Sequence, residues 1–276
     1  MSSTESIVAV RCVACGGSVA WAAGTPAPAC VFCDATALVI MPPEEGVEAP
    51  EGFLPFAVDE SDAERLFRAR ASASIWYPSD LRHASIVLNA VLVPAWSWSA
   101  RLETHYTAVI TAPETRSNKR PIADAEVWDA RGVLVASSPT LSRRELAEIS
   151  PFESGELDPL SRAELPYELG SLTRTAARSA GEAGMAALHQ AAIRDRLAAL
   201  SVKTSTIFSD RRGGPLLLPV WIGVYRRGEV CHRVVVNGQT GAMTGSFPYS
   251  WVKICGAIAL GFAVLAIGLG LLNGRL

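Results

Sequence analysis

One apolar run near the C-terminus constrains this chain more than any other feature. Residues 254–272 carry no charged side chain, and an α-helix of these 19 residues would be about 28 Å long, close to the hydrocarbon core of a bilayer. Trp251 and Lys253 flank the run on one side and Arg275 on the other, as interfacial residues do. The run predicts one C-terminal transmembrane helix over 252–273, a tail anchor with the lipid bilayer as partner. A multi-span transporter is excluded.

The rest of the composition is that of a folded, weakly charged protein. The chain has 276 residues, of which 49% are hydrophobic and 19% charged, and its net charge is −2. This composition excludes a disordered or collagen-like chain, and the net charge provides no general attraction to nucleic acid. The first residues contain neither a basic nor an apolar stretch, so no signal peptide is expected and the N-terminal body is placed in the cytoplasm.

Four of the six cysteines form two Cys-x2-Cys pairs, Cys12 with Cys15 and Cys30 with Cys33. Each pair turns tightly enough to bring two thiolates onto one ion, and this spacing is typical of a zinc ribbon. The pattern predicts a ribbon over 8–40 with these four cysteines as ligands of a structural Zn²⁺ that is needed for folding. Four thiolates leave no open position for catalysis. Iron in the same geometry and a redox-active dithiol are the alternatives.

The ribbon is not expected to bind nucleic acid. Its only charged side chains are Arg11 and Asp34, whereas a ribbon that binds nucleic acid needs basic side chains to displace counterions. The loop after Trp21 is rich in alanine and proline, which suits contact with a protein. Trp21 either takes part in that contact or covers the small core of the ribbon.

Between the ribbon and the apolar run, the pattern is that of an α+β body. An acidic segment rich in proline and glycine predicts a flexible linker over 41–53. A helix is expected over 60–74, where Ser61 and Glu64 fit a capping box. A first helix-plus-antiparallel-sheet unit is therefore placed over 54–137. Its strands are expected over 86–99, 104–111, 125–129 and 132–137.

An internal repeat indicates a second unit of the same kind. Leu92-Val-Pro94-Ala-Trp96 recurs as Leu217-Leu-Pro219-Val-Trp221, an offset of 125 residues. A helical stripe over 172–200 precedes the second copy, as a helix precedes the first, and Asn237-Gly238 begins a hairpin loop in it. The proline in each strand indicates a sheet edge or a bulge. The second unit is therefore placed over 171–250.

An acidic segment with several prolines lies between the two units, over 138–170, and its net charge is −4. It predicts a loose connector, with an acidic docking segment as the alternative. The fold class expected for the whole chain is therefore α+β. It comprises an N-terminal zinc ribbon, two repeated helix-plus-antiparallel-sheet units and one C-terminal transmembrane helix.

No motif of a known catalytic class occurs in the chain. The sequence lacks a P-loop, a Gly-x-Ser-x-Gly elbow and a His-Glu-x2-His site. His105 and His232 occupy similar positions in the two units and would share a face if the units stack alike. Cys231 and Cys255 are expected to be packing residues. An enzyme is therefore not expected, and a site in a cleft between the two units is the alternative.

Several short motifs in one order resemble a known bacterial family. A Cys-x2-Cys-Gly ribbon is followed by Leu54-Pro-Phe56, by the two Pro-x-Trp strands, by Val236-Asn-Gly-Gln-Thr-Gly241 and by Phe247-Pro-Tyr-Ser-Trp-Val-Lys253. This order resembles the membrane-anchored bacterial proteins with a TFIIB-type zinc ribbon, which are often labelled primosomal protein N′ or helicase-like from the ribbon alone. Asp34 stands where these proteins usually have glycine, and no helicase motif is present.

The resemblance implies an adaptor at the bacterial inner (cytoplasmic) membrane, in some cases found beside stress-responsive or scaffold-type membrane proteins. Together with the apolar run and the neutral ribbon, it predicts a tail-anchored zinc-ribbon adaptor or scaffold. Its cytoplasmic body would be a platform for protein partners. A membrane-tethered nucleic-acid-binding protein is the alternative function.

Overall fold

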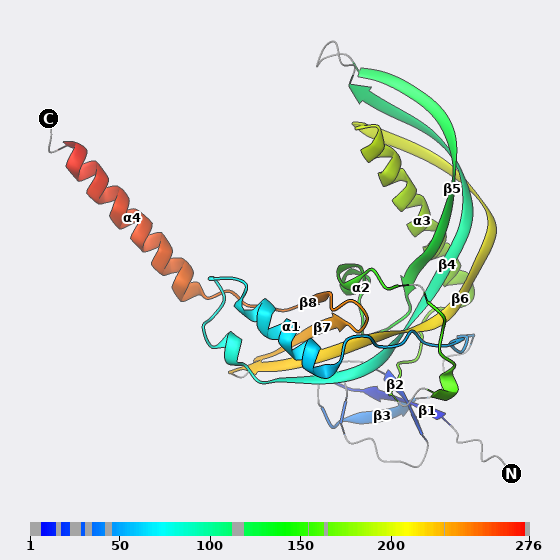
Figure 1. Ribbon diagram of the computed structural model, residues 1–276, viewed down its shortest axis with the longest axis horizontal. Helices are drawn as coiled ribbons and strands as arrows, with labels where there is room; N and C mark the ends of the chain where they lie inside the picture. Colours follow the sequence, from blue (N-terminus) through cyan, green and yellow to red (C-terminus); the bar gives the residue numbers. More distant parts are fainter. Residues whose placement is uncertain are drawn as a thin grey trace.

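The chain folds around two antiparallel sheets. The computed structural model describes residues 7–14, 18–22, 29–30, 35–41, 46–111, 119–153, 155–162, 165–228 and 230–273. These residues form a small three-stranded sheet and a five-stranded sheet that curls along its length (Figure 1). Three α-helices lie against the large sheet, and a fourth stands away from it (Figure 1). The class is α+β, with more residues in strands than in helices.

The small N-terminal sheet has the strand order β2-β1-β3 and is antiparallel throughout. Its strands are β1 (Ile7–Cys12), β2 (Ser18–Ala22) and β3 (Leu38–Met41). Val10 and Cys12 of the central strand are buried, and the backbone N–H of Cys30 donates to the carbonyl oxygen of Ala35 at 2.8 Å. Cys12 is thus the last residue of β1, and Cys30 precedes β3 in the chain.

The large sheet has the strand order β5-β4-β6-β7-β8, and all its neighbours are antiparallel. Its strands are β4 (Ile86–Thr111), β5 (Lys119–Ala136), β6 (Ser201–Arg227), β7 (Val230–Asn237) and β8 (Met243–Gly245). The four short strands expected over 86–137 are thus two long ones. Bulges explain the difference, because the register shifts at Trp98/Ala100 and at Ser99/Arg101 let the strands bend without ending.

The two copies of the sequence repeat lie side by side in this one sheet. Leu92 pairs with Pro219 and Pro94 with Leu217, so the copies run antiparallel to each other across β4 and β6. The expectation of two repeated sheet units is therefore wrong, because the copies form a single continuous sheet. Each proline lies where the outer strand, β5 or β7, stops pairing, so its missing N–H removes no ladder hydrogen bond.

Two helices cover opposite ends of the large sheet, α1 (Glu60–Ser72) and α3 (Arg174–Arg196). Phe67 of α1 packs on Tyr225 of β6, with ring centroids 5.3 Å apart. Met185 of α3 belongs to the same buried cluster as Trp96 and Trp98 of β4. α1 also contacts β4, and α3 also contacts β5 and β6, so neither helix is confined to one copy of the repeat. A 3-10 turn, η1 (Leu81–His83), leads from α1 into β4.

The start of α1 differs from the prediction. Asp59 is the N-cap residue, and its carboxylate accepts a hydrogen bond from the backbone N–H of Asp62 at 2.8 Å. The hydroxyl of Ser61 donates to the same carboxylate at 2.8 Å. The capping box expected at Ser61 and Glu64 is therefore wrong, because the aspartate two residues earlier takes the capping position.

The described part of the segment expected to be a loose connector packs on the other face of the sheet. It contains α2 (Arg143–Ile149), which begins with a capping box formed by Ser142 and Glu145, and the 3-10 turn η2 (Leu160–Arg162). Ile149 is fully buried in one cluster with Val235 of β7. The expectation of a loose segment is wrong because several of its apolar side chains, among them Leu146 and Ile149, are buried despite its overall negative charge.

The linker expected over 41–53 is docked on β6 in its described part. The backbone N–H of Glu51 donates to the carbonyl oxygen of Pro215 at 2.8 Å, and that of Leu54 donates to Leu217 at 3.0 Å. These bonds add a short strand-like segment to the sheet. The described part of this linker is therefore not a free tether.

An equivalent segment precedes α3 and docks on β4. The backbone N–H of Leu92 donates to the carbonyl oxygen of Pro166 at 3.0 Å, and that of Glu168 donates to Leu92 at 2.9 Å. Since Leu54 has the same place beside Leu217, the two copies match here in backbone geometry. They differ in chemistry, because a buried carboxylate stands in one copy where the other has a buried leucine.

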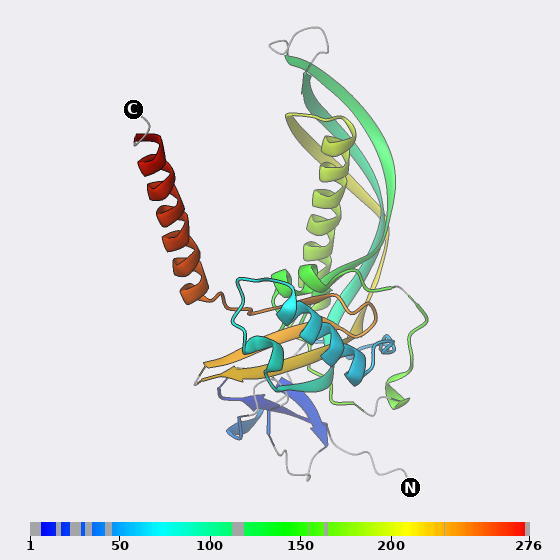
Figure 2. The same ribbon diagram turned by 60° about the vertical axis from the view of Figure 1, so that its left-hand side comes forward.

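The C-terminal helix α4 (Trp251–Asn273) stands away from the body in both views (Figures 1 and 2). Among the described residues, no helix is long and apolar enough to cross a membrane. The transmembrane helix expected over 252–273, and the tail-anchored arrangement with it, is therefore corrected. The large apolar side chains described on α4 are exposed, among them Leu260, Phe262 and Val264.

Candidate functional site

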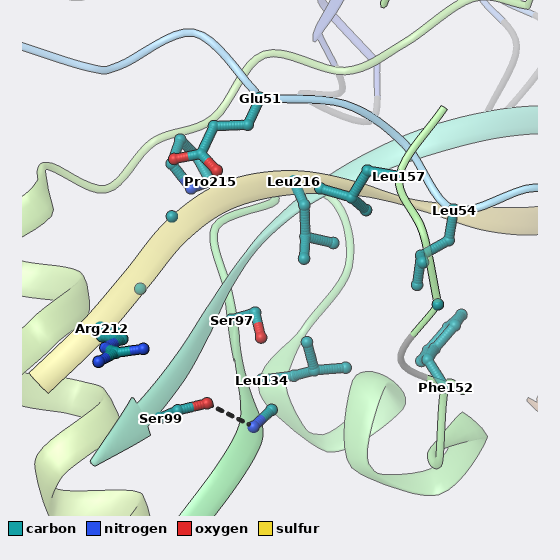
Figure 3. A pocket seen from close by; sticks show the side chains of 14 residues that line it. Glu51, Leu54, Ser97, Ser99, Leu134, Phe152, Leu157, Arg212, Pro215 and Leu216 are labelled. Carbon is teal, nitrogen blue, oxygen red and sulfur yellow. Dashed lines mark hydrogen bonds between the residues drawn. The ribbon is translucent and has the colours of Figure 1, made fainter. Parts of the chain in front are cut away.

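A pocket of about 400 Å³ lies where β6 passes the linker and the connector. Figure 3 shows its two sides: Ser97, Ser99 and Arg212 lie on one, and leucine and phenylalanine side chains lie on the other. The hydroxyl of Ser99 accepts a hydrogen bond from the backbone N–H of Gly132 at 3.0 Å. Glu51 comes from the docked linker and lies over β6. The pocket is therefore assembled from five separate segments of the chain.

This pocket offers charged and polar side chains to a ligand. Glu51 and Arg212 form no ion pair with another described residue and remain able to contact a charged or polar ligand. The serine hydroxyls have no histidine, lysine or cysteine among the residues that line the pocket. A nucleophilic serine needs such a base within hydrogen-bond reach. Sequence reasoning missed the pocket because its residues are far apart along the chain.

A larger groove of about 760 Å³ runs along the outer edge of β5. Six consecutive strand residues, Arg131–Ala136, line it on one side. Its other walls are α2, through residues such as Leu146, and α3, through small residues such as Ala183 and Gly184. Gly132 and Leu134 line both this groove and the pocket of Figure 3, so the two hollows adjoin each other. We call this hollow the β5 groove.

A buried polar cluster is centred on Glu168. The carboxylate is fully buried and accepts hydrogen bonds from the hydroxyls of Ser138 and Thr140. Arg233 lies close by, donates to the carbonyl oxygen of Thr140 at 2.9 Å and leaves its Nε and Nη2 atoms buried without a hydrogen-bond partner among the described residues. Burial raises the pKa of Glu168 from 4.5 to about 7, although both hydroxyls and the charge of Arg233 act to lower it.

The raised pKa of Glu168 predicts a stability that falls as pH rises. The folded chain holds a proton on Glu168 between pH 4.5 and about 7 that the unfolded chain has released, so folding becomes less favourable across this range. The expected loss is about 3 kcal/mol. Urea unfolding of the wild type and of Glu168→Gln at pH 5 and pH 8 checks it, since the variant lacks this titration. Equal pH dependence in the two proteins would contradict the prediction.

The metal site expected in the N-terminal sheet is not found in the described part of the chain. There, no group of three or more His, Cys, Asp or Glu side chains is placed to hold a metal ion. The prediction of a zinc-bound ribbon is therefore corrected: the described part of this segment is a three-stranded sheet without a metal site. Cys12 and Cys30 are buried in one apolar cluster, whereas Cys15 and Cys33 lie outside the described residues. Ligation by all four cysteines stays a prediction.

Zinc analysis of the purified full chain tests that prediction. Two buried cysteines, each the first of its pair, fit a thiolate set better than a solvent-exposed redox pair, so we expect one Zn²⁺ per chain. Cys30→Ser should lose the metal, and Cys231→Ser, at an exposed cysteine of β7, should keep it. A wild-type chain that folds without zinc would contradict this prediction.

The arrangement most like a catalytic triad is buried under α3. The Nδ1 atom of His189 lies 3.0 Å from the hydroxyl oxygen of Thr104, and its Nε2 atom lies 2.9 Å from the carboxylate of Glu126. Both His189 and Thr104 are buried, and neither lines the pocket of Figure 3 or the β5 groove. A hydroxyl that no substrate can reach cannot act as a nucleophile. The histidine is thus a structural residue that packs on Trp128.

His105 and His232 are not brought together. His105 pairs with Ser205 and Ala125 toward one end of the large sheet. His232 pairs with Tyr225 toward the opposite end. The prediction that the two histidines share a face is therefore wrong, because the two copies of the repeat run antiparallel in one sheet. With a single continuous sheet, the cleft expected between two units is also absent from the described chain.

The first turn of α4 is fixed to the body. The Nζ atom of Lys253 donates to the carbonyl oxygens of Ile75 and Tyr77 at 3.1 and 2.7 Å. The backbone N–H of Ser250 donates to the carbonyl oxygen of Trp76 at 2.7 Å. The exposed apolar surface of α4 therefore begins at a defined place, beside the tryptophan and the exposed Ile75.

Comparison with known proteins adds no family. No family model matches the chain, and neither a curated protein nor a solved structure matches it. The resemblance to membrane-anchored zinc-ribbon proteins therefore stays a prediction.

Proposed function

We propose that this chain is a membrane-bound adaptor that binds another protein. α4 contacts a lipid bilayer through its apolar side chains, and the body presents its hollows to a protein partner. The exposed apolar surface of α4 is the observation that carries the proposal. In keeping with the family resemblance, the membrane is the bacterial inner membrane and the body lies on its cytoplasmic side.

Contact with lipid explains the apolar surface of α4 better than packing against the body does. Successive residues of an α-helix are about 100° apart, so exposed Val252, Ile258 and Leu260 point in different directions around α4. A helix that is apolar all round is normally buried in a protein core or in lipid. Transfer of one such side chain from water stabilises a bound state by about 1.5–3 kcal/mol.

The junction between α4 and the body supports the same proposal. Trp76, Tyr249 and Ile254 line a shallow apolar hollow there, and Lys253 is bonded to the adjoining loop. Aromatic residues and lysine are typical of the boundary between lipid and water. A body fixed to the first turn of α4 in this way would be held at the membrane surface.

An adaptor accounts for the hollows better than an enzyme. No histidine, lysine or cysteine is among the residues that line the pocket of Figure 3, and His189 is buried. The β5 groove is lined mainly by small and apolar residues, which suits contact with a protein. We therefore propose a binding role for the body and no catalytic step.

Flotation with lipid vesicles tests the proposal. The purified full chain is mixed with phosphatidylcholine vesicles, the detergent is removed, and the sample is centrifuged in a density gradient at low and at high salt. We expect the chain in the floating fraction at both salt concentrations, because apolar contacts are not screened by ions. Recovery at the bottom of the gradient, or flotation at low salt only, would overturn the proposal.

A further inference from the structure

At the outer edge of β5, in the β5 groove, backbone groups have no strand partner among the described residues. β5 is the last strand of the sheet, and the N–H of Ser137 donates toward β4, to the carbonyl oxygen of Pro94 at 3.1 Å. Because hydrogen-bonding direction alternates along an antiparallel strand, the N–H and C=O groups of Leu134 and Ala136 point away from β4. These groups face the groove that runs along the same residues.

This part of the edge lacks the features that protect the rest of β5. The strand begins with Lys119, Arg120 and Pro121, which block pairing with another chain. After the bulge at Gly132, whose φ is +62°, the sequence continues as Val-Leu-Val-Ala without charge or proline. An exposed strand edge of this composition is a ready template for another strand.

Between α2 and α3, the β5 groove leaves space for one further strand. Val133 and Val135 pack toward α3, whereas Leu134 and Ala136 pack toward the cluster that contains α2. A strand added to β5 would alternate in the same way. Its side chains would meet Ala183 and neighbouring small residues on one side and α2 on the other.

The charge at the groove selects the chemistry of the added strand. Arg131 and Arg143 both line the groove, both are exposed, and neither forms an ion pair with another described residue. The next residue of α2, Arg144, differs because it is paired with Glu148 at 2.7 Å. Two unpaired guanidinium groups beside an apolar floor are complementary to carboxylates that flank an apolar segment.

We propose that the β5 groove binds an extended, acidic segment of a partner protein, which adds as a strand to the outer edge of β5. Backbone hydrogen bonds to Leu134 and Ala136 would hold the segment, apolar side chains would fill the groove, and carboxylates would contact Arg131 and Arg143. This inference rests on the proposed adaptor role and names the chemistry of its partner.

A peptide selection tests the inference without lipid vesicles, so its failure is separate from a failure of membrane binding. A phage library of short random peptides is selected on the full chain in detergent. Ala136→Pro removes the outward N–H without breaking a bond to β4, and Ala136→Ser is its control. Arg143→Glu, with Arg144→Glu as control, tests the charge without touching the strand.

We expect the selected peptides to have an apolar core flanked by Asp or Glu. Binding should be lost in Ala136→Pro, fall about tenfold or more in Arg143→Glu, and persist in both controls. Hydrogen exchange should show new protection at the amides of Leu134 and Ala136. Peptides that bind Ala136→Pro equally well, peptides without acidic residues, or a dimer of this chain that occupies the edge would overturn the inference.

Discussion

Replacing Leu260 and Val264 of α4 by aspartate should release the protein from lipid vesicles, with at least a hundredfold lower partition. These side chains are 67% and 62% exposed, so the substitutions disturb no packing in the body. Each apolar side chain removed from lipid loses about 1.5–3 kcal/mol, and each 1.4 kcal/mol is a tenfold change. Desolvation of two carboxylates adds to the loss. Flotation of the double variant measures it.

A matched control separates lipid binding from general stickiness. Val87 and Ile207 are apolar, each 60% exposed, and lie on the large sheet rather than on α4. The double variant Val87→Asp with Ile207→Asp carries the same added charge and should float like the wild type. If both double variants lose flotation equally, the contact is not specific to α4.

Replacing Asn237 by alanine should destabilise the fold by about 4 kcal/mol, the largest effect expected in the body. The side chain is fully buried, and its Nδ2 atom donates to the carbonyl oxygens of Ile149 and Pro151 at 2.8 and 3.0 Å. Its Oδ1 atom accepts from the backbone N–H groups of Gln239 and Thr240 at 2.7 and 3.1 Å. Alanine leaves all four groups without this partner.

The neighbouring Gln239 supplies the control for this variant. Its side chain accepts one exposed hydrogen bond, from the backbone N–H of Glu153 at 3.0 Å, so Gln239→Ala should cost about 0.5 kcal/mol. Urea unfolding in mild detergent compares the two. Equal loss in both variants would show that the hairpin, rather than the bonds of Asn237 to the connector, limits stability.

The sequence predicts the helices and the hairpin loop of this fold better than it predicts how they are arranged. The helical patterns over 60–74 and 172–200 are found as α1 and α3, and the Asn237-Gly238 loop joins β7 to β8 as predicted. These signals are local, because capping, periodicity and turn chemistry act within a few residues. The pairing of Pro94 with Leu217 depends on contacts across more than a hundred residues, which an offset in sequence does not specify.

The candidate sites were missed for a related reason. Glu168 looked like one of several charges in an acidic connector, and only its place beside Leu92 shows that it is buried. The β5 groove depends on which strand lies at the sheet edge and on where α2 and α3 pack. The one available signal was the change from charged to apolar residues along β5.

Co-flotation of a groove-binding peptide tests the central claim most directly, because it requires lipid binding and protein binding by the same chain. A labelled peptide from the selection is mixed with phosphatidylcholine vesicles and the full chain. We predict that the peptide floats with the wild type and stays at the bottom with either the α4 double aspartate variant or Ala136→Pro. A peptide that stays at the bottom with the wild type, or floats equally with both variants, would contradict the adaptor account.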